Sequence, residues 1–483
     1  IKLTAIQGPK PEDNRWYKIA QSAARVAMMV RNVSVTYKNT YAMSISGFRP
    51  EIGDMLGQTK GASGFAPGLD FAFGMTGDSY INKALDNGWL VSDSVVSPAT
   101  TNAQEDLQIR MTLEPVRDLK IDLNAGRTRN KSNQIQYMYE GMPQIQSGNF
   151  NMTVITIGSA FERRSASNGY SSSSFNRFLG NLDIIKNRIE NMYAGVPYQG
   201  QSGLNQQPLY QVNKYSSDVM IPAFLAAYTG RSASNSALDL FPGILSMMPN
   251  WRATYSGLSK LEFFKKYFKS VTLNHAYRST YSVGSYSTFQ NFHSYMGDWG
   301  FVDDIQTGIP VPSSMYDVSA VSINEQFSPL LGVDVTFKNG ITTKVEYKTT
   351  RILNLSLAAN QIVESSTKDF VLGMGYKIMG LELFPGRNKK DSKNKISNDL
   401  ALRMDVSFRN QSALARDIQQ VTTQATSGNK ALKISFSADY TLSRLLSVSF
   451  YYDRQKNTPL VSASSYPVTS ADFGMRLKFS LTR

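Results

Sequence analysis

Apolar and polar residues alternate along segment after segment of this chain, and this period of two constrains the fold more than any other feature. In residues 33–45, apolar side chains such as Val33, Val35 and Tyr37 occupy odd positions, while the even positions are polar or small. Such alternation over eight or more residues is typical of a β-strand with two different faces. The pattern recurs about a dozen times along the chain. The sequence therefore predicts an all-β fold.

About 12 strands are expected from these segments, joined by recognisable turns. Asn339-Gly340 lies between two alternating runs, which is the strongest short signal for a hairpin. Pro115 lies in the turn between two other runs, and Pro329 inside the sixth segment predicts a break or bulge. The expected strands lie near residues 31–48, 103–113, 119–139, 149–161, 271–290, 318–338, 341–358, 369–378, 400–409, 431–440, 446–453 and 471–481.

Alternation alone fits both a soluble β-sandwich and a membrane β-barrel. Two further features favour the barrel. Aromatic residues such as Tyr376, Phe408 and Tyr452 tend to end the apolar stripes, as an interfacial girdle requires, and short connections alternate with long ones. No apolar stretch approaches the ~20 residues of a membrane helix, since the nearest candidate, residues 219–230, is too short and contains Pro222. We therefore expect a transmembrane antiparallel β-barrel.

The long connections predict how the chain is organised. A C-terminal end in the periplasm, as is normal for outer-membrane barrels, places the short turns on the periplasmic side. Long insertions into a barrel are usually functional, and one of them carries apolar residues at helical spacing. The expected parts are a lead-in segment (1–30), barrel strands (31–161) with a long external loop (49–102), a long periplasmic or lumenal insertion (162–270), and barrel strands (271–483) with a basic periplasmic loop (379–399).

Composition gives no support to catalytic or metal chemistry. The chain has no cysteine and two histidines, His275 and His293, which excludes disulfides, a thiolate nucleophile and a Cys/His zinc site. The glycine-rich stretch 57–74 lacks the Lys-Ser/Thr of a phosphate-binding loop. The net charge of +14 comes from scattered basic residues that are not grouped with stacking aromatics. We expect no enzyme activity, no catalytic residue, no metal, no cofactor and no nucleic-acid partner.

Charged residues on the parity opposite the apolar stripes are expected to face a hydrated lumen, in which cations outnumber carboxylates. Solvation of a water-filled interior is the simpler interpretation, and selection of anionic solutes is the sharper alternative. The expected lumen-facing residues are Arg110, Lys120, Asp122, Lys338, Lys344, Glu346, Lys348, Arg403, Asp405, Lys433, Asp439, Arg476 and Lys478.

Runs spread over most of the chain carry a family resemblance. They are PNWRATYSGL (249–258), FFKK (263–266), HAYRSTYSVG (275–284), INEQFSPL (323–330), SFSADY (435–440) and FGMRL (473–477). These runs resemble the C-terminal part of the SprA (Sov) family, the outer-membrane translocons of the type IX secretion system. Family members are far longer than this chain, and the barrel that they form belongs to the class of about 36 strands. The strands expected here would be about a third of such a barrel.

The resemblance implies a protein-conducting channel, integral to the bacterial outer membrane, that exports folded cargo from the periplasm to the cell surface, in a system also associated with gliding motility. The implied partners are a PorV-type shuttle barrel at a lateral opening, a periplasmic plug protein, cargo bearing a type IX C-terminal signal, the remainder of the same barrel, and outer-membrane lipid. No individual functional residue is carried over. Two alternatives stay open: a general diffusion porin for small solutes, which would close from this chain alone, and a soluble all-β surface adhesin, which would be released without detergent.

Overall fold

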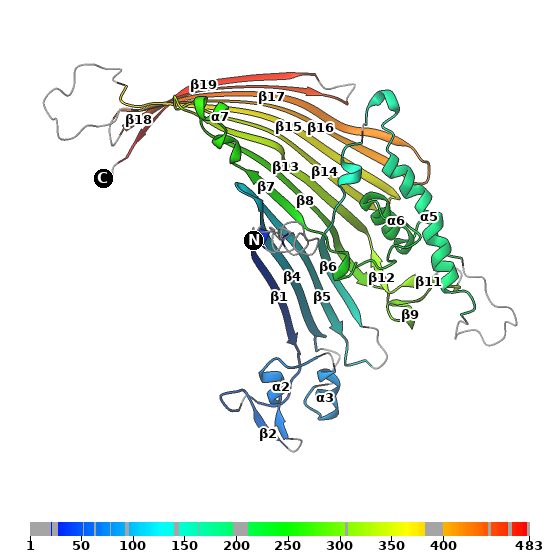
Figure 1. The fold of residues 1–483 in the computed structure, drawn as a ribbon. Helices are drawn as coiled ribbons and strands as arrows, with labels where there is room; N and C mark the ends of the chain where they lie inside the picture. Colours follow the sequence, from blue (N-terminus) through cyan, green and yellow to red (C-terminus); the bar gives the residue numbers. More distant parts are fainter. Residues whose placement is uncertain are drawn as a thin grey trace, which may run out of the picture.

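A single curved antiparallel sheet of 14 strands dominates the computed structural model (Figure 1). The structure describes residues 21, 28–51, 53–61, 64–77, 79–91, 96–139, 144–162, 164–196, 211–304, 308–381, 399–442, 446–461 and 466–480. The lead-in segment expected at 1–30 and the basic centre of the expected loop 379–399 lie almost entirely outside these residues.

Twelve strands follow one another across the sheet in chain order, one for each strand expected from the sequence. They are β1 (Val30–Ser44), β4 (Ala99–Val116), β5 (Leu119–Ile135), β6 (Ile145–Thr153), β8 (Phe268–Thr288), β13 (Ala320–Phe337), β14 (Thr342–Ser356), β15 (Gln361–Ile378), β16 (Leu400–Asp417), β17 (Thr423–Thr441), β18 (Leu446–Pro459) and β19 (Val468–Phe479). Two short strands, β7 (Asn250–Tyr255) and β12 (Tyr316–Val318), complete the sheet.

β6 and β7 share one strand position, although residues 154–249 separate them. β6 pairs with one half of β5 and β8, and β7 pairs with the other half of the same two strands. The insertion therefore leaves the sheet in the middle of a strand and returns at Asn250. This corrects the expected insertion bounds of 162–270, because residues 250–255 belong to the sheet and the true connection from β7 to β8 is short.

The strands are longer than the alternating patterns indicated. β14 and β15 are joined by residues 357–360, and β16 and β17 by residues 418–422. The expectation of long connections at this end of the sheet is wrong at these two places, because polar residues continue the strands beyond the apolar stripes. The expected irregularity at Pro329 is confirmed, since the β13–β14 register shifts between Phe327 and Leu331.

The helices lie mostly in the insertion. α4 (Ile157–Ala160), η2 (Ala166–Asn168), α5 (Ser173–Met192), α6 (Ser217–Thr229) and η3 (Ile244–Ser246) belong to it, while η4 (Gly257–Lys260) and α7 (Glu262–Tyr267) connect β7 to β8. Ser172 caps α5 by accepting a hydrogen bond from the N–H of Phe175, and Gly230 ends α6 in the left-handed conformation. No helix among the described residues is both long and apolar enough to cross a bilayer.

The residues of the expected external loop form a small unit at the ends of β1 and β4. It contains the hairpin of β2 (Thr59–Gly61) and β3 (Gly64–Ala66) and the helices α2 (Leu69–Ala72) and α3 (Tyr80–Asp86), packed around Tyr80, Ile81 and Trp89. A second small sheet, formed by β9 (Phe292–Met296), β10 (Trp299–Asp303) and β11 (Pro310–Ser314), lies between β8 and β13 in the sequence.

The large sheet is open in the part of the chain that the structure describes. β1 pairs with β4 alone and β19 pairs with β18 alone, so each has one edge without a strand neighbour. Figure 1 shows these two strands at opposite ends of the curved sheet. Unpaired edges expose a row of backbone N–H and C=O groups that can add another strand.

Candidate functional site: the two faces of the sheet and the helices docked on one of them

One face of the sheet carries a continuous apolar belt. Residues that face each other on neighbouring strands point to the same side of the sheet. In the half of the sheet that contains the short turns, each pair of neighbouring strands places apolar side chains opposite one another on this side. One row across five strands is Met374, Met404, Phe436, Tyr452 and Phe473. A second row, toward the other edge, is Val33, Met111, Leu123, Trp251 and Tyr277. The alternation read from the sequence therefore becomes one shared surface.

The belt has a height suited to a hydrocarbon layer. On β16 it runs from Leu400 to Phe408, which corresponds to about 20 Å along the barrel axis at a rise of ~3.3 Å per residue and a tilt of ~40°. Outer-membrane barrels carry an apolar band about 25 Å tall. Many belt side chains remain exposed, including Phe473 at 85% and Met404 at 41%.

The opposite face is polar. Register places twelve of the thirteen expected lumen-facing residues on this face, because each lies one position away from a belt residue. Eight of the twelve are cations and four are carboxylates. Lys338 is different, since it lies in the turn that follows β13 and is not in a strand.

Ion pairs on this polar face compensate part of its charge. Glu346 is flanked by Lys344 at 2.9 Å and Lys348 at 2.8 Å, and Lys120 lies 3.2 Å from Asp122. Among the described residues, the cations Arg403, Lys433 and Lys478 and the carboxylates Asp405 and Asp439 form no ion pair. The positive balance of the expected set thus comes from its eight cations against four carboxylates.

The helical insertion covers the other half of the belt's own face. On β14, the odd residues Val345 and Tyr347 belong to the belt, and farther along the same parity Leu353 and Leu355 are fully buried. They pack in a core with α5 and α6, whose residues 219–228 are almost all inaccessible to solvent. The strand thus extends past the belt, and the insertion covers its apolar residues there.

The two apolar stretches of residues 162–270 are covered differently. α6 is buried within the chain, whereas Phe263 on α7 is 70% exposed. Large exposed apolar patches are unusual, so burial of Phe263 in the lumen or against a partner stays a prediction. Phe263 lies at the short-turn end of the sheet in an aromatic cluster with Phe264, Tyr267 and Phe268.

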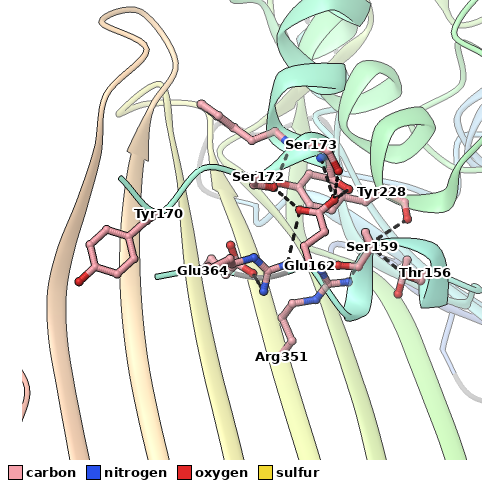
Figure 2. A network of polar contacts seen from close by, with 12 residues as sticks. Thr156, Ser159, Glu162, Tyr170, Ser172, Ser173, Tyr228, Arg351 and Glu364 are labelled. Atoms are coloured by element: carbon pink, nitrogen blue, oxygen red, sulfur yellow. Dashed lines mark hydrogen bonds and ion pairs between the residues drawn. The ribbon is translucent and has the colours of Figure 1, made fainter. Parts of the chain in front are cut away.

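A buried ionic network joins the insertion to the sheet where the belt ends (Figure 2). Arg351 on β14 lies 2.6 Å from Glu325 on β13, and both side chains are less than 5% exposed. Arg351 also donates hydrogen bonds to the backbone oxygen and the hydroxyl of Ser159 in α4. The hydroxyls of Thr156 and Tyr277 both donate to Glu325. Arg351 and Glu325 thus each have one partner in the sheet and one in the insertion.

A second pair extends the network along the same face. Glu364 on β15 accepts from Arg416 on β16 at 3.1 Å and lies 2.6 Å from Arg164 of the insertion. Arg416 is fully buried, donates to the backbone oxygen of Tyr170 and lies over the ring of Phe175. Buried charges are costly unless they are paired and hydrogen-bonded, so these contacts tie the position of the insertion to the strands.

Glu162 organises the start of α5. Its carboxylate accepts hydrogen bonds from the hydroxyls of Ser172, Ser173 and Ser174 and from the N–H of Ser174. Burial alone would raise the pKa of Glu162, but these hydrogen bonds outweigh it and lower the pKa to about 2. The carboxylate therefore stays ionised at neutral pH.

One sequence signal for this network was missed by following the apolar pattern alone. Glu325, Arg351, Glu364 and Arg416 are charged residues on the apolar parity of their strands. Such residues interrupt a stripe that would otherwise face lipid. Two contacts from the insertion carry no sequence signal, because Ser159 and Tyr170 contribute backbone oxygens to them.

The network holds the insertion against the sheet, and a cavity lies beside it. Among the described residues, no group of three or more His, Asp or Glu side chains could hold a metal ion. A cavity of about 240 Å³ lies at the junction of belt, network and insertion, lined among others by Phe161, Tyr347, Thr349, Lys368 and Asn410.

Comparison with known proteins adds little to this geometry. No family model and no curated protein matches the chain. Among solved structures, the in-vitro folded OmpT, an outer membrane protein of Vibrio cholerae in its trimer form, is similar over 93% of this chain and 99% of that chain, with 8% identity and a TM-score of 0.21. A loop L8 deletion mutant of OmpT covers 93% and 98%, with 7% identity and a TM-score of 0.20. Scores this low carry no argument about shared fold or function.

Proposed function

We propose that this chain forms part of the wall of a wide, protein-conducting β-barrel in the bacterial outer membrane, a translocon of the type IX secretion system. The observation that carries the proposal is the sheet with two opposite faces, apolar over a height of about 20 Å on one side and charged on the other. A belt of this height is suited to lipid, and the opposite face is suited to a hydrated lumen.

The unpaired edges support a wall rather than a closed small pore. Barrel diameter grows with strand number, so twelve strand positions would close to a bore too narrow for a folded domain. β1 and β19 instead each lack a second neighbour among the described residues. Strands from elsewhere in a larger barrel would satisfy both edges and widen the lumen.

The proposed role needs no active site in the sheet. Folded cargo with a type IX C-terminal signal would pass along the polar face, where Arg403, Lys433 and Lys478 contribute positive charge. A PorV-type shuttle barrel at a lateral opening, a periplasmic plug protein and the remainder of the same barrel are the proposed partners. The assignment to the type IX system is supported by the family resemblance of the runs at 249–258, 275–284 and 323–330.

Two measurements test the proposal. The mass of the intact polypeptide from detergent-solubilised outer membrane should be several times that of this chain, whose own mass is 53.7 kDa. The isolated chain should give no stable, uniform conductance in planar bilayers, because its edge strands lack partners. A steady small-solute conductance from the isolated chain would favour a self-contained porin. Release of the native protein by a detergent-free wash would favour a soluble adhesin.

A further inference from the structure

We infer that the apolar belt, at its boundary away from the short turns, binds the phosphorylated sugar headgroup of an anionic outer-leaflet lipid. This inference rests on the membrane placement proposed above, and it concerns a site that the transport role does not require. It starts from the residues that follow the belt on β14 to β19.

The boundary of the belt runs obliquely across the strands. On β15 the first polar residue beyond the belt is Lys368, on β16 it is Asn410 and on β17 it is Lys430, and these three face one another in register. On β18 the boundary lies closer to the short turns, at Arg454, which faces Ile434 of the belt. The boundary thus forms one continuous edge across four neighbouring strands, with its shift between β17 and β18.

Cations concentrate at this boundary. Lys368, Lys430 and Arg454 are the first polar positions on three of the strands, and Lys456 follows Arg454 on the same face. All four are exposed, and no described carboxylate forms an ion pair with any of them. Glu364, the nearest acid farther along β15 on this face, is already held by Arg164 and Arg416. The boundary thus presents uncompensated positive charge.

The opposite edge of the belt has a different character. There the same face ends in Ile378 on β15, Leu400 on β16, Tyr440 on β17 and Leu446 on β18. On these four strands the described residues of the belt's face thus place cations and Asn410 at one edge and apolar residues at the other. This asymmetry points to an anion that is present in one leaflet.

The cavity at the junction supplies the second element of the site. It opens beside Lys368 and combines aromatic walls from Phe161 and Tyr347 with the hydroxyl of Thr349 and the amide of Asn410. The carboxylates that also line it, Glu162, Glu325 and Glu364, are each paired with Arg164 or Arg351 of the same lining. Aromatic faces with a few hydroxyl and amide groups suit a sugar ring, and the adjacent cations suit phosphate. Its position directly above the belt lets acyl chains lie on the apolar surface below. These three features together select a phosphorylated glycolipid over a free anion.

The test uses the full-length protein extracted gently from its own outer membrane. Native mass spectrometry would identify and count the bound lipid in the wild type and in the triple variant Lys368→Gln/Lys430→Gln/Arg454→Gln. The matched control, Arg403→Gln/Lys433→Gln/Lys478→Gln, removes the same charge from the polar face. At roughly one fivefold step per cation near a membrane surface, the triple variant should bind about 100-fold more weakly. The control should retain wild-type lipid.

Add-back experiments separate the headgroup chemistries. Lipid A with both phosphates should rebind to delipidated wild-type protein, whereas its dephosphorylated form should bind about 100-fold more weakly. Phosphatidylglycerol, which lacks the sugar, should also bind more weakly, and inorganic phosphate should not displace lipid A. Equal binding of lipid A by wild type and triple variant would overturn the inference.

The two proposals fail separately. If alkaline washing leaves the wild type and the triple variant in the membrane but lipid retention is equal, the lipid site is wrong and the membrane barrel stands. If the wild-type protein itself is washed off, then no lipid boundary exists and both proposals are overturned. The variant residues are exposed, so a folding defect is not expected, and a heat-modifiable band on gels would verify assembly.

Discussion

The backbone oxygen of Thr153 accepts a hydrogen bond from the N–H of Met248, so the chain re-enters the sheet next to the point where it left. Val154 donates to the backbone oxygen of Ser279, and Asn250 then pairs with Asn124. Val154 and Asn250 thus occupy successive positions of one strand. The helical insertion is an excursion from a strand that is otherwise continuous in register and parity.

Deleting residues 155–249 and joining Val154 directly to Asn250 should preserve the sheet. Met152 and Trp251 would stay on the belt's face in the joined strand, because the register on β5 and β8 counts four steps between them, an even number. We expect the full-length protein with this deletion to reach the membrane and keep its heat-modifiable mobility, while secretion or partner capture is lost. Unchanged secretion and partner capture would mean that the insertion is a tolerated linker.

A deletion that is one residue shorter provides the control. Removing 156–249 retains Ile155 and adds one residue to the joined strand. A one-residue shift moves every following side chain to the other face, so Trp251 would leave the belt unless a bulge absorbs the extra residue. Assembly should be clearly poorer than for the first deletion. Equal assembly of the two variants would contradict the continuous-strand arrangement.

Arginine at Met404 should cost about 2–4 kcal/mol of folding free energy in lipid, because the residue lies on the belt near its middle. Arginine at Ser407, on the polar face of the same strand, should change the folding free energy by about 0.5 kcal/mol or less. Urea titration of the full-length barrel in vesicles would measure both. Equal losses at the two positions would reject the assignment of faces.

The Arg351–Glu325 pair should show strong coupling. Arg351→Met leaves a buried carboxylate without its cation and should cost about 3–5 kcal/mol. Adding Glu325→Gln removes that charge and should recover most of the loss. Protease cleavage within α4 to α6 under denaturant titration would report the stability of the docked insertion. Additive effects of the two substitutions would contradict a shared buried pair.

Docking of the start of α5 should weaken in acid. The pKa of Glu162 is lowered to about 2 from the ordinary 4.5, so its stabilising contribution is complete above about pH 4.5 and is lost as the pH falls toward 2. Pepsin cleavage near Ser172 should therefore rise across this window in the wild type. Glu162→Gln should show no such rise beyond the enzyme's own pH dependence, since it removes the titrating group. Parallel profiles for the two proteins would refute the role of Glu162.

Local pattern was sufficient for the strands and for their two faces. Side chains in a strand point alternately to opposite sides, so Met404 and Arg403 must separate wherever the strand packs. Asn339-Gly340 and Pro329 likewise act through their own backbone preferences, which need no distant partner. These features depend on residues that are close in sequence, so the sequence alone is enough to predict them.

Tertiary structure alone decided what covers each face. Leu353 and Val345 have the same parity on one strand, yet Leu353 is buried in the core that includes α5 and α6, whereas Val345 belongs to the belt. The buried charge of Arg351 is satisfied by the backbone oxygen of Ser159, whose place follows from an excursion in the middle of a strand. Such contacts join segments far apart in the chain, and their free energy depends on mutual burial. A pattern of alternation records which face a residue takes, but it does not record whether lipid, water or a helix meets that face.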